Sequence, residues 1–218
     1  MELVRLDKFL KTDVNSFENF AKLPYVHEDP EFVDHQRFSP GNKQLPYWLK
    51  IYTALIVHKL EAYLDVTIQP EHRHMTHEDW VVINEYNSCQ HCGWHQDFYL
   101  DGRRDIDIWG DSPHLVVMRF VLTIGHDKVF STRSVQKNCD GRLEKNHSRD
   151  LTRYELSDGD ALIISEEFDQ KHEHAVEKDV EPNNDGETRY TYMLTFGVTP
   201  ADWLKCRDKV LLDGSSSE

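Results

Sequence analysis

The chain of 218 residues is 39% hydrophobic and 11% aromatic, which is enough apolar material for one domain to bury a core. Its formal net charge of -14 at pH 7 argues against non-specific binding to nucleic acid, because phosphate binding depends on basic surface. No stretch is long and apolar enough to span a membrane, and the first residues lack the apolar segment of a signal peptide. We expect a monomer with a cytoplasmic or nuclear location and no membrane partner.

The cysteines are few for a chain of this length, as in proteins of a reducing compartment, so we expect free thiols. They are Cys89, Cys92, Cys139 and Cys206. Cys89 and Cys92 form a C-x-x-C pair, a spacing that also occurs in zinc sites, but no second pair lies nearby. We place this pair in the loop before His95.

The first predicted element is an amphipathic helix between Pro46 and Leu64, with the proline at the first helical position. Its apolar residues recur at intervals of three and four, which is the period of one helix face. They are Trp48, Ile51, Tyr52, Leu55, Ile56, Leu60 and Leu64. The sequence therefore predicts a helix ahead of the β-rich part of the chain.

Four later runs, rich in β-branched and aromatic residues, predict strands. They cover residues 81–86, 115–124, 160–165 and 189–198. The segments between them hold turn residues and charges, with no helical period long enough for a parallel crossover. The strands should therefore pair in an antiparallel arrangement.

The expected fold class is α+β, with a double-stranded β-helix (jelly roll) core and N-terminal supporting helices. We assign residues 1–75 to a helical extension that packs on the core, residues 76–204 to the jelly-roll domain, and residues 205–218 to a tail.

Two imidazoles and one carboxylate that leave three positions open form a ligand set suited to non-haem iron(II). The pattern His-x-Asp begins at His27, His77 and His95. The first lies in a polar loop before a proline, and the second lies ahead of the first strong strand. Only His95-Gln96-Asp97 follows a predicted strand, so we predict His95 and Asp97 as metal ligands.

The third ligand is predicted downstream, where His172 and His174 compete. We favour His174 because Ala175 and Val176 after it have the character of a strand start, which would fix the direction of its ring. His172 stays open as the alternative.

These residues resemble the AlkB-like branch of the iron(II) and 2-oxoglutarate dioxygenases. Asn84-Glu85-Tyr86 matches the family's N-x-Y pair, and nine residues separate Tyr86 from His95 as in the family. Gly159-Asp160 opens a strand before the distal histidine, and the last strand begins with Arg189. The similarity covers residues 46 to 198.

The resemblance implies an oxidoreductase that uses Fe(II), 2-oxoglutarate and O2, with His95, Asp97 and His174 as the catalytic metal ligands. It implies that Asn84 contacts the oxo-acid end of 2-oxoglutarate. Tyr86 and Arg189 would bind its far carboxylate, and Thr191 would add a hydroxyl. A guanidinium offers paired donors to a carboxylate, and strand alternation puts Arg189 and Thr191 on one face.

The chain departs from the family at several positions. Thr195 stands where a second arginine is usual, and Tyr99 stands where an acidic residue is common. A different register would put Thr191 at the place of the first arginine. Arg119 lies in an apolar run, so it points either to solvent or inward at a carboxylate, where it could replace the missing arginine.

The substrate class stays open at this point. The first interpretation is hydroxylation or oxidative demethylation of a methylated nucleobase, with Trp94, Phe98 and Tyr99 as stacking surfaces. The alternative is a hydroxylase of a protein side chain or small metabolite, which agrees better with the net negative charge. A second alternative is a catalytically inactive binding domain.

Overall fold

A computed structural model describes most of the chain. The described residues are 3–11, 14–27, 33–34, 36–39, 45–70, 80–87, 90–100, 103–104, 115–137, 143–144, 151–178 and 188–212. Cys89, Cys139 and the predicted tail end at 213–218 lie outside them.

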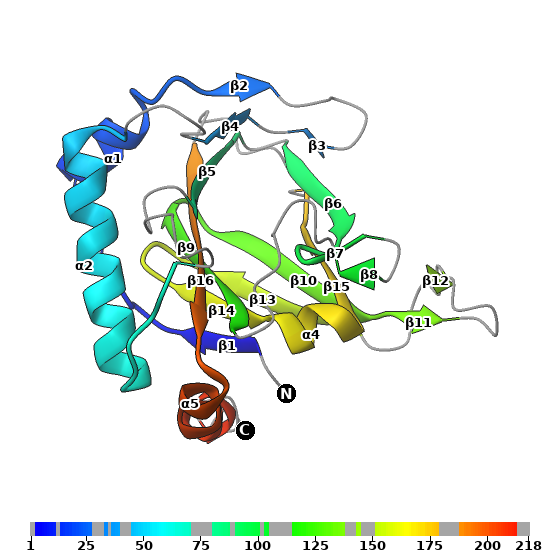
Figure 1. Cartoon of the computed structure of the whole chain (residues 1–218). Helices are drawn as coiled ribbons and strands as arrows, with labels where there is room; N and C mark the ends of the chain where they lie inside the picture. The colour runs from blue at the N-terminus through cyan, green and yellow to red at the C-terminus, as the bar shows by residue number, and fades with distance from the viewer. Residues whose placement is uncertain are drawn as a thin grey trace.

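Two antiparallel sheets form the centre of the molecule (Figure 1). Among the described residues, the larger sheet runs in the order β1 (Leu3–Leu6), β14 (Ala161–Ser165), β9 (Val116–Gly125), β16 (Arg189–Val198), β5 (Val81–Tyr86), β4 (Gln36–Phe38) and β2 (Val26–His27). The smaller runs β13 (Thr152–Leu156), β10 (Lys128–Ser134), β15 (His172–Val176), β6 (His91–His95) and β3 (Val33–Asp34).

Short hairpins and helices complete the described elements. The hairpins pair β7 (Tyr99–Leu100) with β8 (Arg103–Arg104), and β11 (Gln136–Lys137) with β12 (Leu143–Glu144). The helices are α1 (Val14–Phe20), α2 (Tyr47–Leu64), α4 (Glu166–Lys171) and α5 (Pro200–Leu212). This arrangement confirms the predicted α+β class with a double-sheet core and supporting N-terminal helices.

Helix α2 lies along the larger sheet, on the side away from the smaller sheet (Figure 1). Leu49, Ile56 and Leu60 are fully buried there, and the Tyr192 hydroxyl of β16 donates to Thr53 at 2.9 Å. The main core therefore lies between α2 and the larger sheet. It joins residues from both ends of the chain.

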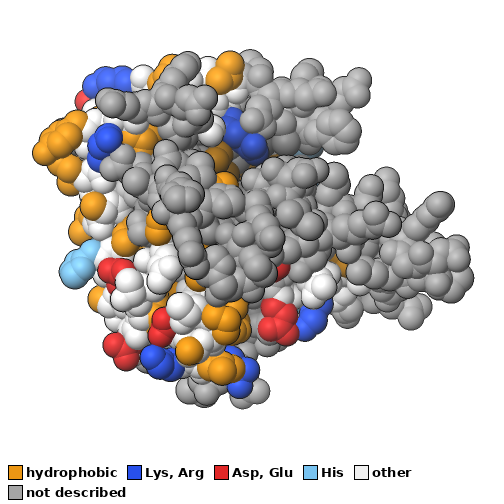
Figure 2. Space-filling view, viewed as in Figure 1, with side chains coloured by type: hydrophobic (Ala, Val, Ile, Leu, Met, Phe, Trp, Pro, Cys, Tyr) orange, Lys and Arg blue, Asp and Glu red, His pale blue; other side chains and the backbone are white. Residues whose placement is uncertain are grey.

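Helix α2 confirms the helix predicted between Pro46 and Leu64, with one correction to its start and one to its buried face. Pro46 is the N-cap and not the first helical residue. Ile51 and Leu55 are 54% and 44% exposed, because the outer surface of α2 turns them to solvent. Figure 2 shows hydrophobic side chains along the edge of the molecule where α2 lies. The spacing of apolar residues predicted the helix correctly, although it did not distinguish the buried face of the helix from the exposed one.

A second core lies between the two sheets. It includes Val121, Leu162 and Ile164 of the larger sheet and Phe130 and Val176 of the smaller one. Residues two apart on a strand share a face, so alternate residues of β5, β9 and β16 point into this interior. Polar residues that point the same way are therefore enclosed between the sheets.

The predicted strands 81–86 and 189–198 match β5 and β16, and 115–124 differs from β9 by one residue. The C-terminal helix α5 was not predicted, and it continues past the expected domain boundary at residue 204. Within the described residues, no helix is long and apolar enough to cross a membrane.

Candidate metal centre

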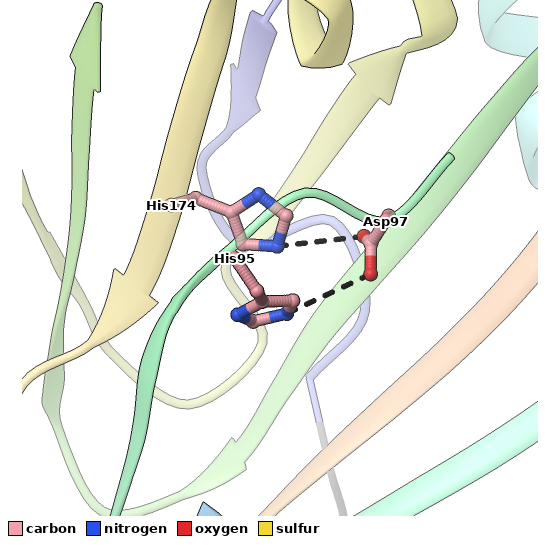
Figure 3. A group of neighbouring side chains, drawn as sticks. All are labelled: His95, Asp97 and His174. Atoms are coloured by element: carbon pink, nitrogen blue, oxygen red, sulfur yellow. Dashed lines mark ion pairs between the residues drawn. The ribbon is translucent and has the colours of Figure 1, made fainter. Parts of the chain in front are cut away.

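The structure brings His95, Asp97 and His174 together at one edge of the space between the sheets (Figure 3). His95 ends β6 and lies opposite His174 on β15. Their ring centroids are 4.3 Å apart. Asp97 Oδ1 is 3.7 Å from His95 Nε2, and Asp97 Oδ2 is 3.5 Å from His174 Nε2. All three candidate ligand atoms lie within 4.8 Å of one another, so one ion can contact all of them.

A β-bulge sets the direction of the His95 ring. Cys92 pairs with Val176 and His95 with His174, so β6 has one residue more than β15 between these pairs. His95 Nδ1 donates to the carbonyl oxygen of Gly93 at 2.7 Å. This bond holds the ring with Nε2 toward Asp97, so Nε2 is the nitrogen that can bind a metal once the ring has lost its second proton.

The competing histidine, His172, lies elsewhere. Its ring stacks on Phe168 with centroids 4.1 Å apart, and its Nδ1 donates to the Phe168 carbonyl oxygen at 3.0 Å. His174, in contrast, is 4% exposed and stacks on Phe130 in the core between the sheets. Only His174 joins the group around Asp97.

Arg119 points inward and forms an ion pair with Asp97. Its Nε also donates to the Thr195 hydroxyl at 3.3 Å, and its guanidinium lies over the Phe98 ring. Burial opposes ionisation of Asp97, but Arg119 and the other positive groups around it together outweigh burial and lower the pKa of the carboxyl. Asp97 is therefore held as a carboxylate.

Asp169, which the sequence did not single out, holds the turn that carries Asp97. The backbone N–H groups of Asp97 and Phe98 donate to its two carboxylate oxygens at 2.9 Å and 2.8 Å. The Gln96 side chain donates to its backbone carbonyl oxygen. Burial, then the charge of Asp97, raises the pKa of Asp169 to about 7. Only its burial in the folded chain distinguishes it from its neighbours in a short polar helix.

The two histidines differ in their protonation. Burial lowers the pKa of His174 to about 3, so its ring is neutral near pH 7. Burial also works against a charged His95. However, the hydrogen bond and charge of Cys92, followed by the charge of Asp97, raise the pKa of His95 to about 9. Cys92 is a free thiol inside β6, and not in a loop as predicted.

The predicted co-substrate residues form one buried group on two neighbouring strands. Arg189 lies opposite Tyr86, and Thr191 lies opposite Asn84. Asn84 Nδ2 donates to the Tyr86 hydroxyl at 3.2 Å, and Arg189 donates to Thr123 at 3.1 Å. The Thr191 hydroxyl is buried with no hydrogen-bond partner among the described residues. A buried hydroxyl in this state is available to a ligand.

Two of the three aromatic substrate candidates, Trp94 and Phe98, can be placed by their side chains. Trp94 lies within the bulge between Cys92 and His95, and the Arg133 guanidinium lies over its ring at 4.3 Å. Phe98 is 1% exposed under Arg119. Tyr99 belongs to β7, and its side chain lies outside the described residues. Neither Trp94 nor Phe98 presents an open ring beside the metal ligands.

Protein-family models do not match the sequence, and curated proteins do not match it either. Among solved structures, OsALKBH1 is similar with a TM-score of 0.58 and 16% identity, over 88% of this chain and 96% of that one. A Pseudomonas putida prolyl-4-hydroxylase gives a TM-score of 0.48 at 11% identity, over 91% and 92% of the two chains.

A Burkholderia pseudomallei oxidoreductase of the 2OG-Fe(II) oxygenase family gives a TM-score of 0.48 at 14% identity, over 89% of this chain and 84% of that one. At these identities the comparison concerns architecture and not activity. The chain therefore shares the overall fold of OsALKBH1.

Proposed function

We propose that this protein is an iron(II)- and 2-oxoglutarate-dependent dioxygenase that hydroxylates or oxidatively demethylates its substrate. One observation carries the proposal. The ligand atoms of His95, Asp97 and His174 converge within 4.8 Å at the same interior into which Arg189 and Thr191 point. A facial metal set beside a buried carboxylate-binding group is what this chemistry requires.

The residues present fit the metal. Two imidazole nitrogens and one carboxylate oxygen leave positions for a second ligand and for dioxygen. Asp97 is ionised and His174 is neutral, which are the forms that bind a cation. Iron(II) bound there supplies the redox chemistry by which 2-oxoglutarate and dioxygen are consumed together.

The protein's own groups bind and orient the co-substrate. The Arg189 guanidinium is 1% exposed and suits the far carboxylate of 2-oxoglutarate, since a buried cation binds an anion strongly. Thr191 adds a hydroxyl from the same strand face, and Tyr86 and Asn84 complete the group from β5. Arg119 is a further candidate, because it points into the same interior beside Asp97.

For the substrate, we propose a protein side chain or small metabolite, and we rank a methylated nucleobase second. The Trp94 ring is covered by Arg133, and Phe98 is buried, so neither supports a base-stacking surface. The net charge of -14 also opposes attraction to a polyanion. Binding to single-stranded nucleic acid that weakens steeply with salt would reverse this order.

We also propose a monomer in a reducing location, cytoplasmic or nuclear. The support for the location is that Cys92 and Cys206 form no disulfide among the described residues.

The test of the activity is an anaerobic titration with iron(II) and 2-oxoglutarate. The signal is the visible charge-transfer absorption band of the iron chelate. We expect the band in the wild type and its loss in Asp97→Ala. The matched control is Asp202→Ala, which removes a carboxylate that bonds to Thr199 and Lys205 at the start of α5. No band in the wild type would contradict the proposal and favour an inactive binding domain.

A further inference from the structure

Asp169 is a fully buried carboxylate, and within the part of the chain that the structure describes it has no hydrogen bond to the predicted co-substrate group and none to a lysine or arginine side chain. It lies in α4, a short helix between β14 and β15 that begins at the N-cap Ser165. Phe168 packs its side chain into the core between the sheets and so holds α4 in place. The next residue, Asp169, is thereby directed at the metal ligands.

Two ligands of the candidate metal centre depend on this carboxylate. It accepts from the backbone N–H of Asp97 and of Phe98, so the turn after β6 is fixed at Asp97. Its Oδ1 lies 3.6 Å from Nδ1 of His174, the ring nitrogen that faces away from Asp97. That Nδ1 has no hydrogen-bond partner among the described residues. One carboxylate thus touches both the turn of one ligand and the ring of another.

We propose that Asp169 is a positioning residue of the metal centre: it holds the turn that carries Asp97 and keeps the His174 ring with Nε2 toward the metal. The inference rests on the proposed function. A carboxylate behind a ligating imidazole fixes the tautomer and raises the basicity of the ring. The hydrogen bonds from the turn leave Oδ1 aimed at Nδ1, so one side chain serves both purposes.

The chain offers a matched control in Asp160. This carboxylate is also buried, and it also accepts two backbone N–H groups, from Lys8 at 2.9 Å and Ser157 at 3.1 Å. It also pairs with Arg5 at 3.2 Å, and none of its partners among the described residues belongs to the candidate metal centre. Asp169→Asn and Asp160→Asn therefore each change a buried carboxyl that accepts two backbone N–H groups, and only Asp169 lies at the candidate metal centre.

The experiment is a titration of the full chain with Co(II), with a thermal unfolding scan of each variant. We expect Asp169→Asn to bind Co(II) about 10–100-fold more weakly than the wild type. Asp160→Asn should lose thermal stability and still bind Co(II) like the wild type. Equal Co(II) affinity in the wild type and Asp169→Asn would overturn the inference while leaving the proposed function in place.

A second measurement needs no metal. In the metal-free protein labelled with 15N-histidine, we expect His174 to carry its proton on Nδ1, and Asp169→Asn to shift this tautomer. The His174 signal is the one that His174→Ala removes. An unchanged tautomer would overturn the orienting role. If the wild type binds no Co(II), the proposed function fails, and the tautomer still decides whether Asp169 orients His174.

Should Asp169→Asn fail to fold, Asp169→Glu keeps the charge and moves the carboxylate by one methylene. We expect a folded protein with weaker Co(II) binding. Wild-type affinity in Asp169→Glu would count against a positional role.

Discussion

Arg119 on β9 lies directly opposite Thr195 on β16 and donates from Nε to the threonine hydroxyl at 3.3 Å. Its other end forms the ion pair with Asp97. Thr195 is the position where the resemblance leads one to expect a second arginine. A guanidinium from the neighbouring strand therefore links this threonine to the candidate metal ligand Asp97.

The first prediction concerns this ion pair. Arg119→Met removes the guanidinium that pairs with the buried Asp97 carboxylate, which should cost up to about 3–5 kcal/mol of unfolding free energy in the metal-free protein. Urea denaturation measures the loss. Saturating Co(II) should reduce it, since a divalent ion then neutralises Asp97.

The control for this prediction is Arg133→Met, which breaks the ion pair with Glu173 on the other face of the smaller sheet. Co(II) should not alter its effect. An equal loss for Arg119→Met with and without Co(II) would show that no cation binds at Asp97.

The second prediction separates the two competing histidines. His174→Ala should abolish Co(II) binding, because it removes one of three ligands from a group whose atoms lie within 4.8 Å. His172→Ala should bind Co(II) normally, since that ring is engaged with Phe168. Absorption titration of both variants checks this. The reverse outcome would make His172 the ligand.

The third prediction uses the unsatisfied hydroxyl of Thr191. Thr191→Val removes a group without a hydrogen-bond partner among the described residues, so the ligand-free protein should keep its stability. Binding of 2-oxoglutarate should weaken by roughly 2–10-fold, because one hydrogen bond contributes about 0.5–1.5 kcal/mol to the binding free energy. Calorimetric titration of the Co(II) form measures the affinity.

Thr123→Val provides the contrast, because Thr123 accepts a hydrogen bond from Arg189 and its removal should lower stability. Undiminished 2-oxoglutarate binding by Thr191→Val would exclude this hydroxyl from the co-substrate group.

The fourth prediction is a pH dependence of metal binding. The pKa of His95 is raised to about 9, so its ring is protonated at neutral pH and must lose that proton to bind a metal. Co(II) binding at pH 7 should release about one proton, and the affinity should rise by roughly tenfold per pH unit up to that pKa. His174, with its pKa lowered to about 3, contributes nothing in this range.

Calorimetry in two buffers of different ionisation enthalpy counts the protons released. Binding at pH 7 with no proton release would mean that His95 is neutral before the metal arrives, and that Cys92 and Asp97 do not raise its pKa.

Much of the fold could be predicted because the relevant signals are local. The run Val81–Tyr86 is a strand in the sequence and in the structure, since β-branched and aromatic residues suit a pleated surface. Helix α2 follows from its period of three and four. Strand β10 and helix α5 were missed, because β10 mixes polar and apolar residues and five of the 13 residues of α5 are charged.

The sequence by itself predicted His95 and Asp97 as metal ligands, because His95-Gln96-Asp97 follows a strand, and it favoured His174 over His172 because His174 begins another run. The fold brings His174 to Asp97 and leaves His172 on Phe168. The sequence could not predict the direction or the protonation of the His95 and His174 rings. A bulge between β6 and β15 turns His95, and burial neutralises His174. Both effects come from packing partners distant in sequence.

Only the tertiary structure decided where Arg119 and Asp169 lie. In the sequence, Arg119 was compatible with solvent or interior, and Asp169 was one acidic residue among several between residues 166 and 173. Sheet register places Arg119 beside Thr195 and Asp97, and the docking of α4 places Asp169 behind His174. Asp97 is 22 positions from Arg119 along the chain and 72 positions from Asp169. Contacts at such separations leave no local pattern in the sequence, and for that physical reason only the folded chain could reveal them.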